Sequence, residues 1–389
     1  MSPNPLLKST KAYARELGYD LPDMLVCSVR AFMVHAYCIW KTLRLELGPD
    51  KGYELYHDVI DKLMDATVSG AAASLGITEV KDLPTLGRLV ERGSLDFPLL
   101  YETVTSTPDV YVGRVLWCVN PYYGPCRNYL DRQAYFRHER DVTLDPYLSG
   151  FVKYAKEHGF KGEVEVDVPQ SRCTNADARF CEYAIRRKGT PEIKPTILPV
   201  DEKKFAEVDM GDEEPLLYVI RKQGKKAEDQ VPGSFLAYFM YDLAAYDTFT
   251  ERLGKKKGLE LYHKLWLLTY PADWTKEARL ELEIGRASSL EELAKIIVFC
   301  EKKRFTTYQV AVKGSRQVIL TGTSDPFVEM GKFAGKEVGC DYLRAVASAN
   351  QELVNRVVSE AKMAAKAKAT ITKALARNDD KNEIVIEKK

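Results

Sequence analysis

Two stretches of this sequence repeat each other and decide the fold. Residues Leu47–His57 read LGPDKGYELYH and residues Leu253–His263 read LGKKKGLELYH, so that eight of the eleven positions are identical. An apolar, aromatic-rich segment precedes each stretch, at Val29–Leu47 and at Phe235–Leu253. Chance rarely produces so dense a match, and internal self-similarity is typical of duplicated architectures. The sequence therefore predicts a tandem duplication.

Each stretch predicts a helix, a tight turn and a second helix. Gly48 and Gly254 stand where a helix ends with a residue that is free to take a positive φ. The residues that follow place apolar side chains at helical spacing, such as Leu55, Val59 and Leu63 in the first copy. We expect both copies to bury one face of this second helix.

The elements after the motif follow the same order in both copies. Ser94 and Ser289 open similar segments, and alternating runs that are typical of strands follow at Val110–Leu116 and Tyr308–Leu320. Each copy then ends with a helix and a hairpin, whose last strand in the second copy contains Ile384. The expected fold class is α+β, with N-terminal helices followed by an antiparallel sheet in each of two tandem copies.

A segment rich in proline and charge separates the two copies. We expect a first repeat over residues 1–190, which contains the paired cysteines, a linker over 191–232, and a second repeat over 233–389. Five prolines among many charged residues give the linker a composition unlike that of a core. One apolar run within it, Leu216–Ile220, could add an edge strand or cover a seam between the repeats.

Length and composition fit a globular protein of two domains. The chain has 389 residues, and single cores stop growing near roughly 250–300 residues. Charged residues make up 29% of the chain and the net charge is +1, which leaves no field that would attract nucleic acid. The N-terminus lacks the features of a secretory signal, and we expect no stretch near the roughly 18 apolar residues that span a bilayer. These features predict a cytoplasmic protein with neither nucleic-acid nor membrane partners.

Four cysteines of the first repeat are the candidate metal ligands. Cys118 and Cys126 have seven residues between them, and Cys173 and Cys181 have the same spacing around the turn of the last hairpin. Cytosolic cysteines rarely form disulfides. Four thiolates suit tetrahedral Zn²⁺, although zinc knuckles usually have two to four intervening residues. An iron–sulfur cluster on the same thiolates is less favoured, since no ferredoxin spacing is present, and buried or idle thiols are the alternative.

Other residues of the first repeat are candidates for acid–base or nucleophilic chemistry. Without a metal, Cys118 could act as a nucleophile if Arg114, His57 or His138 lowers its pKa. His57 recurs in the second copy, so a retained packing position explains it better than a catalytic role does. Asp177 stands in the hairpin turn, where an Asx turn is the structural alternative.

Aromatic side chains of the first repeat could line a small-molecule pocket. The candidates are His35, Tyr37, Trp40, Tyr56 and Tyr122. His35 lies in the apolar first helix, where a hydrogen-bonded core histidine is the more common case. The sequence contains no glycine-rich phosphate loop, no Ser-centred nucleophile elbow and no His-Glu-x-x-His motif.

These motifs resemble the L-2-amino-thiazoline-4-carboxylic acid hydrolase family, which is similar to the 4-vinyl-reductase small-ligand domains of bacteriochlorophyll vinyl reductase and phenol-sensing regulators. The resemblance rests on Leu-Gly-x-x-Lys-Gly, on a central strand that leads to a loop with Cys or Pro, and on the hairpin from Ser171 to Tyr183. The sensors of that group close a zinc site with such a hairpin, aided by a Glu three residues before its first Cys. This chain has Gln170 at that position.

The resemblance implies a 4-vinyl-reductase-domain-like fold and a hydrolase that cleaves a C–N or C–S bond of a small carboxylated heterocycle or amino-acid-like substrate. The cysteines would then be metal ligands or thiol machinery, and His57 or His138 an acid–base group. Three alternatives stay open: a non-catalytic protein that binds a small aromatic molecule, an accessory subunit of a larger enzyme, and a structural protein that forms homo-oligomers. Asn382 stands in the second copy where Cys181 stands in the first, so the resemblance places any site in the first repeat.

Overall fold

The computed structural model divides the chain into two units. The structure describes residues 14–15, 17–96, 99–117, 145–167, 181–191, 214–270, 273–333, 335–337, 339–363 and 367–388. The N-terminal unit comprises Leu25–Gly233, and the C-terminal unit comprises Ser234–Lys389 together with Met1–Met24. The division after residue 233 lies close to the expected start of the second repeat, whereas the first 24 residues group with the C-terminal unit.

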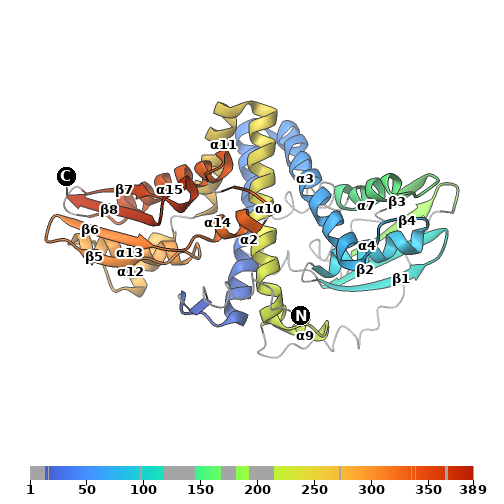
Figure 1. Ribbon diagram of the computed structural model, residues 1–389, viewed down its shortest axis with the longest axis horizontal. Coiled ribbons are helices and arrows are strands. Elements are labelled where there is room, and N and C mark those ends of the chain that lie inside the picture. The colour runs from blue at the N-terminus through green and yellow to red at the C-terminus, as the bar shows by residue number, and fades with distance from the viewer. Residues whose placement is uncertain are drawn as a thin grey trace. The chain divides into compact units, whose positions relative to one another are not determined.

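The N-terminal unit places helices on one antiparallel sheet (Figure 1). Its elements are α2 (Leu21–Leu47), α3 (Pro49–Leu75), α4 (Leu83–Asp96), β1 (Leu100–Ser106), β2 (Val110–Trp117), α7 (Asp145–Glu157), β3 (Val164–Asp167), β4 (Cys181–Arg187) and α9 (Pro215–Lys222). The strand order is β1-β2-β4-β3. Helix α4 packs on β1 and β2, while α7 packs on β3 and against α3. Gly87 permits the approach of α4, since a Cβ there would lie 2.3 Å from the Tyr111 ring of β2.

The C-terminal unit has the same arrangement of elements (Figure 1). They are α10 (Ala227–Leu253), α11 (Lys255–Thr269), α12 (Asp273–Glu281), α13 (Leu290–Lys302), β5 (Gln309–Val312), β6 (Gln317–Gly322), α14 (Pro326–Phe333), α15 (Asp341–Glu360), β7 (Ala367–Lys373), η4 (Leu375–Arg377) and β8 (Asn382–Lys388). The strand order is β5-β6-β8-β7. Helix α13 packs on β6 and β8, and α15 packs on β7 and against α11.

The two sheets also share their register. Val115 of β2 pairs with Cys181 of β4, and Gly322 of β6 pairs with Asn382 of β8. Cys181 and Asn382 therefore open equivalent strands. The predicted α+β class and the antiparallel sheets are confirmed, and the common order of elements supports the interpretation as a duplication.

The two glycines of the repeated motif have different structural roles. Gly48 and Gly254 end the preceding helices with φ of 82° and 80°, as expected for a helix terminus. A Cβ on Gly52 would lie 2.9 Å from the carbonyl carbon and oxygen of Leu43 in α2. A Cβ on Gly258 would lie 2.6 Å from a backbone oxygen of α10. The second glycine thus allows two helices of the same unit to cross with their backbones in contact.

Alternating side chains build the core of the C-terminal sheet. Val318 and Leu320 of β6 join Ile384 and Ile386 of β8 in one buried cluster with side chains of α13. The residues between them in these strands are only partly buried. This period of two is what half-buried antiparallel strands require, because one face of the sheet is covered by helices.

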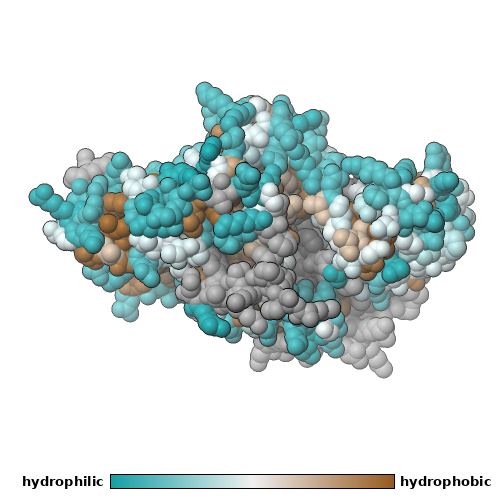
Figure 2. Space-filling model, viewed as in Figure 1, coloured by the Kyte–Doolittle hydropathy of each residue, from teal (hydrophilic) through white to brown (hydrophobic). Residues whose placement is uncertain are grey.

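The edge strand β5 is short and more exposed than its neighbours. Val310 and Val312 are 42% and 52% exposed. Figure 2 shows hydrophobic atoms among hydrophilic ones at this end of the C-terminal unit, where Figure 1 places β5 and β6. A strand of four residues limits the pairing that such an open edge offers to other chains.

The predicted correspondence between Ser94 and Ser289 is wrong. Ser289 begins α13, and its hydroxyl oxygen accepts a hydrogen bond from the backbone N–H of Glu292. Ser94 instead lies near the end of α4. The residue that precedes α4 in the same way is Asp82, whose carboxylate accepts a hydrogen bond from the backbone N–H of Thr85. The true correspondence is between two N-terminal caps of different residue types.

Part of the expected linker is helical. Residues Leu216–Ile220 lie in α9 rather than in an edge strand, because Leu216, Val219 and Ile220 recur at helical spacing and bury one face. Pro215 stands at the start of this helix, where a backbone N–H would have no acceptor within the helix, so its absence in proline does not destabilise the helix. Helix α10 begins at Ala227, which is also within the expected linker.

The expectation that no stretch approaches membrane-spanning composition is also wrong. Helix α2 has 27 residues and is apolar enough to cross a bilayer. However, 67% of its apolar window is buried inside the protein, as in a core helix of a soluble protein. Burial in a protein core and burial in lipid select the same side chains, so hydropathy by itself does not separate the two.

Candidate functional site

A groove runs between α3 and α7 of the N-terminal unit. It has a volume of about 560 Å³ and is lined by Asp65, Val68, Ser69, Ala73, Ile77, Thr78, Gly150, Lys153, Tyr154, Glu157 and His158. Small-molecule sites span roughly 300–1,000 Å³, so the groove is large enough for a metabolite. Sequence reasoning missed all of these residues, because helices that are far apart in the chain bring them together.

The groove presents charges of both signs. Lys153 Nζ lies 3.1 Å from Asp65 Oδ1, and both side chains are more than half exposed. Glu157 follows one turn later on α7 and is exposed. His158 Nδ1 lies 2.8 Å from the carbonyl oxygen of Tyr154, and the two rings stack 3.8 Å apart. A carbonyl oxygen only accepts, so Nδ1 of His158 carries the hydrogen and Nε2 is the acceptor nitrogen.

A cluster of potential ligands lies nearer the start of α3. The ligand atoms of His57, Asp58 and Asp61 are all within 4.8 Å of one another. His57 Nδ1 lies 3.3 Å from Asp61 Oδ2, one helical turn away, and the His57 side chain is 36% exposed. One nitrogen and two carboxylates suit a divalent transition metal. The same geometry suits acid–base chemistry, because a carboxylate that accepts the Nδ1 hydrogen leaves Nε2 as the basic nitrogen.

Electrostatics connect this cluster to the groove. Burial raises the pKa of Asp61, and His57 opposes that effect. The carboxylates of Asp58 and Asp65 raise the pKa of Asp61 further, whereas Lys153 lowers it. Asp61 therefore responds both to His57 and to the Lys153–Asp65 pair of the groove. Since His57, Asp61 and Asp65 are one turn apart on α3, they form a continuous polar stripe.

The C-terminal unit keeps the histidine and loses the rest of this cluster. Lys264 and Leu267 stand at the positions of the two aspartates. His263 Nδ1 lies instead 2.8 Å from Glu352 Oε1 of α15. Its Nε2 is buried and makes no hydrogen bond to the described residues. His263 is therefore part of a contact between helices. Its buried Nε2 is not available to accept a proton from solvent or substrate.

Most of the predicted cysteine site lies outside the described residues. The residues concerned are Cys118, Cys126 and Cys173, and the same holds for His138, Asp177 and Tyr122. Cys181 opens β4 opposite Val115 of β2. Strand β2 ends at Trp117, which directly precedes Cys118 in the chain. The four-cysteine metal site stays a prediction.

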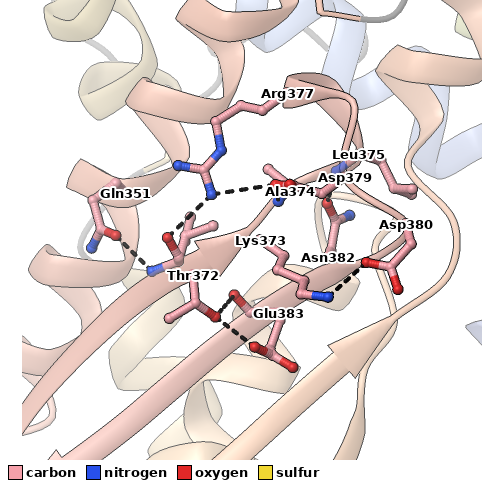
Figure 3. A network of polar contacts seen from close by, with 11 residues as sticks. Gln351, Thr372, Lys373, Ala374, Leu375, Arg377, Asp379, Asp380, Asn382 and Glu383 are labelled. Carbon is pink, nitrogen blue, oxygen red and sulfur yellow. Dashed lines mark hydrogen bonds and ion pairs between the residues drawn. The ribbon is translucent and has the colours of Figure 1, made fainter.

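The C-terminal unit has a structural residue at the place of Cys181. The side-chain oxygen of Asn382 accepts a hydrogen bond from the backbone N–H of Leu375 at 2.9 Å (Figure 3). In the same turn, a carboxylate oxygen of Asp379 accepts the backbone N–H of Ala374 at 2.7 Å. These contacts show polar side chains that satisfy the backbone of a hairpin turn. The turn needs Asn382 for its own stability.

The predicted pocket residues of α2 and α3 lie in the core. His35, Tyr37, Trp40 and Tyr56 are all 3% exposed or less. The rings of Tyr37 and Trp40 pack with their centroids 5.7 Å apart. The lining of the groove between α3 and α7 includes none of these side chains.

A buried row of charges crosses the sheet of the N-terminal unit. Arg114 of β2 contacts Glu182 of β4 at 2.8 Å and Glu102 of β1 at 3.1 Å. Arg114 and Glu182 are 7% and 5% exposed. Charged residues inside an otherwise apolar strand are the sequence feature that could have revealed this row, since buried charges require partners. The row adjoins Cys181, the residue before Glu182.

Hydroxyl groups form a second polar cluster on the helical side of that sheet. Ser94 Oγ lies 2.9 Å from Tyr147 OH and 3.1 Å from Tyr183 OH. Tyr101 and Tyr111 join their hydroxyls in a further hydrogen bond. Burial raises the pKa of Tyr111 to about 12, so this phenol stays protonated near neutral pH. The cluster orients α4 and α7 on the strands.

No protein-family model, curated protein or solved structure matches this chain.

Proposed function

We propose that the N-terminal unit hydrolyses a C–N or C–S bond in a small carboxylated heterocycle or amino-acid-like substrate. The observation that carries this proposal is the His57–Asp61 pair, which lies one helical turn from a groove of metabolite size. The resemblance of the motifs to the L-2-amino-thiazoline-4-carboxylic acid hydrolase family supports the same reaction class. The matching histidine of the C-terminal unit has lost both neighbouring aspartates, which supports a structural role for that unit.

In this proposal His57 is the acid–base residue and Asp61 positions it. Asp61 accepts the Nδ1 hydrogen and so keeps the tautomer in which Nε2 is basic. Nε2 takes a proton from a water molecule as its oxygen forms a bond to the carbon under attack. The same proton then passes to the departing nitrogen or sulfur as the C–N or C–S bond breaks.

Zinc on the four cysteines belongs to the same proposal. The backbone register supports it in part, because Cys181 opens β4 at the end of the sheet where β2 stops, one residue before Cys118. Four thiolates fit the tetrahedral coordination of a closed structural site. The four cysteines would hold a structural Zn²⁺, whereas His57 would move the proton.

Turnover of a defined compound tests the hydrolase. Purified protein is incubated with L-2-amino-thiazoline-4-carboxylic acid and related cyclic amidines, and ring opening is followed by mass spectrometry. Replacing His57 by Gln should lower kcat at least about 100-fold, because acid–base catalysis contributes that much or more. The matched variant His263→Gln should keep full turnover. Equal loss in both variants, or turnover that survives His57→Gln, would contradict the assignment.

The groove also favours a second candidate, a protein that binds a small molecule without transforming it. Its lining offers binding groups, such as Lys153, Asp65 and Glu157, but no thiol. A ligand that co-purifies unchanged, with no turnover of any cyclic amidine, would favour this reading over the hydrolase.

A further inference from the structure

The groove exists because α3 is longer than its counterpart in the C-terminal unit. Helix α3 has 27 residues and α11 has 15, so α3 continues for about three turns beyond the equivalent end of α11. All lining residues from the first wall of the groove, Asp65 to Thr78, lie within or directly after this extension. The extra turns make one wall and α7 makes the other.

In the C-terminal unit, larger side chains occupy the equivalent place. Lys153 and Arg356 each stand eleven residues before the next strand. Arg356 donates hydrogen bonds to the carbonyl oxygens of Leu267 and Tyr270 at the end of α11, at 2.5 and 3.0 Å. By the same count, Gly150 corresponds to Leu353, which is 4% exposed. The C-terminal unit thus has an arginine that caps a helix and a buried leucine where the N-terminal unit has the exposed Lys153 and Gly150.

Small side chains keep the groove open in the N-terminal unit. Ser69 and Ala73 of α3 are exposed and line it, and Gly150 lines it from α7. A Cβ on Gly150 would lie 3.0 Å from Met64 Cβ, so α7 approaches α3 closely beside the groove. The space is therefore bounded by two packed helices and is not a gap left by loose contacts.

The charges of the groove define the ligand class. With His158 neutral, Lys153, Asp65 and Glu157 sum to one negative charge. Lys153 and Asp65 already form an ion pair at 3.1 Å, and exposed pairs of this kind are weak because water screens them. A ligand with a carboxylate and a cationic nitrogen can replace that pair by two new ones. A ligand that carries only negative charge would be repelled by the net negative charge of the groove.

We propose that the groove between α3 and α7 is the binding site of a small zwitterion, whose carboxylate pairs with Lys153 and whose cationic nitrogen pairs with Asp65. Glu157 and the ring of His158, which stacks on Tyr154, also line the site. The inference deepens the proposed function by placing its substrate and naming the groups that recognise it. Kd is measured separately from turnover, and the probe L-arginine is not a cyclic amidine, so the two proposals fail independently.

Calorimetric titration of the full chain tests the recognition by Lys153. The probes are L-2-amino-thiazoline-4-carboxylic acid, the same ring without its carboxylate, and L-arginine. Removing the carboxylate from the probe should raise Kd at least about tenfold in the unchanged protein, because one charge-assisted contact is lost. The variant Lys153→Met should show the same loss with the intact probe and no further loss with the decarboxylated one. Lys156→Met, on the same helix but outside the lining, should bind like the unchanged protein.

A second pair of variants tests the location by filling the space. Ala73→Leu places a larger side chain in the groove and should abolish binding of all three probes. Ala66→Leu makes the same change at another exposed position of α3 that does not line the groove, and should leave Kd unchanged. Both positions are exposed, so both variants should unfold at the same urea concentration as the parent.

The outcomes separate this site from the catalytic proposal. His57→Gln is expected to lose turnover and to bind the probes with an unchanged Kd. Binding that is indifferent to Lys153→Met and Ala73→Leu would overturn the groove site even if the protein is a hydrolase. The groove site would also be overturned if no zwitterionic probe binds at concentrations up to about 10 mM.

Discussion

Asp242 shows how the C-terminal unit satisfies a charge in its core. This carboxylate of α10 is fully buried. It accepts hydrogen bonds from the hydroxyls of Tyr262 and Tyr342 and, at 3.1 Å, from the indole N–H of Trp266. Buried charges persist only where such donors surround them. The network joins α10, α11 and α15, so its role is to hold helices together.

Cys300 provides a pH-dependent test at the residue scale. Burial raises the pKa of this thiol to about 12 from an ordinary 9.0, and Glu301 adds to the effect. The folded protein therefore keeps the proton at pH 10, where the unfolded chain loses it. This contribution to stability is present below pH 9 and is lost as the pH rises toward 12, by about 1 kcal/mol at pH 10.

Urea unfolding at pH 8 and pH 10 measures this effect. The parent protein should lose more free energy of unfolding over that interval than Cys300→Ala does, by about 1 kcal/mol. Other groups titrate equally in both proteins and cancel in the difference. An identical loss in parent and variant would show that the folded thiol titrates normally.

Among single residues, sequence reasoning recognised chemical type but not partners. It named His57 and its copy His263, yet their carboxylate partners differ: one is on the same helix and the other on α15. It also treated His35 as either a core or a pocket residue, and the structure places it in the core. A side chain's partner depends on which helices pack together, and the local sequence does not contain that information.

At the scale of elements, the close crossing of α2 and α3 gives a sharp prediction. Gly52→Ala should destabilise the protein by about 1–3 kcal/mol, because the new methyl group would meet the Leu43 backbone at 2.9 Å. Backbone atoms cannot move aside as the end of a flexible side chain can. The helices must therefore separate, which loosens the packing around the crossing.

Gly70→Ala is the matched control for this crossing. Gly70 lies on the same helix with nothing within 4 Å of its Cβ position. Alanine is favoured over glycine within a helix, so this variant should be more stable by about 0.5–1 kcal/mol. Thermal or urea unfolding of the two variants gives effects of opposite sign if the contact is responsible. Stabilisation by both changes would rule it out.

The elements themselves were largely predictable. The glycine that ends a helix, the apolar spacing of α3 and α11, and the alternation in β2 and β8 all act over a few residues. The predicted elements were wrong where the same local sequence pattern is compatible with two kinds of structure. The run Leu216–Ile220 suits a strand or a helix, and Ser94 resembles a cap although it lies inside α4. Tertiary packing decided both cases.

At the scale of the whole molecule, the two units share a topology and differ in chemistry. The equivalent residues Cys181 and Asn382 allow this asymmetry to be tested. If the four cysteines bind zinc, elemental analysis should find about one equivalent in the parent protein, and Cys181→Ala should lose it. Asn382→Ala should keep the metal but lower the free energy of unfolding by about 1–2 kcal/mol, since the N–H of Leu375 loses its acceptor.

The reverse pattern would overturn this division of roles. A metal-free parent protein, with Cys181→Ala as stable as the parent, would leave the cysteines without a structural or metal-binding role. Loss of metal from Asn382→Ala would show that the C-terminal hairpin belongs to the metal site. Purification without oxygen keeps the thiols reduced for this comparison.

The sequence by itself determined the duplicated helix–turn–helix motif and the α+β class, because turn residues and apolar periodicity act locally. Only the tertiary structure decided where a groove of metabolite size lies. The groove between α3 and α7 depends on how far α3 continues and on how closely Gly150 lets α7 approach it. The space beside the helix stays open in the N-terminal unit, whereas Arg356 occupies the equivalent place in the C-terminal unit. This outcome depends on how two helices pack together, and the sequence of one helix does not specify the position of the other.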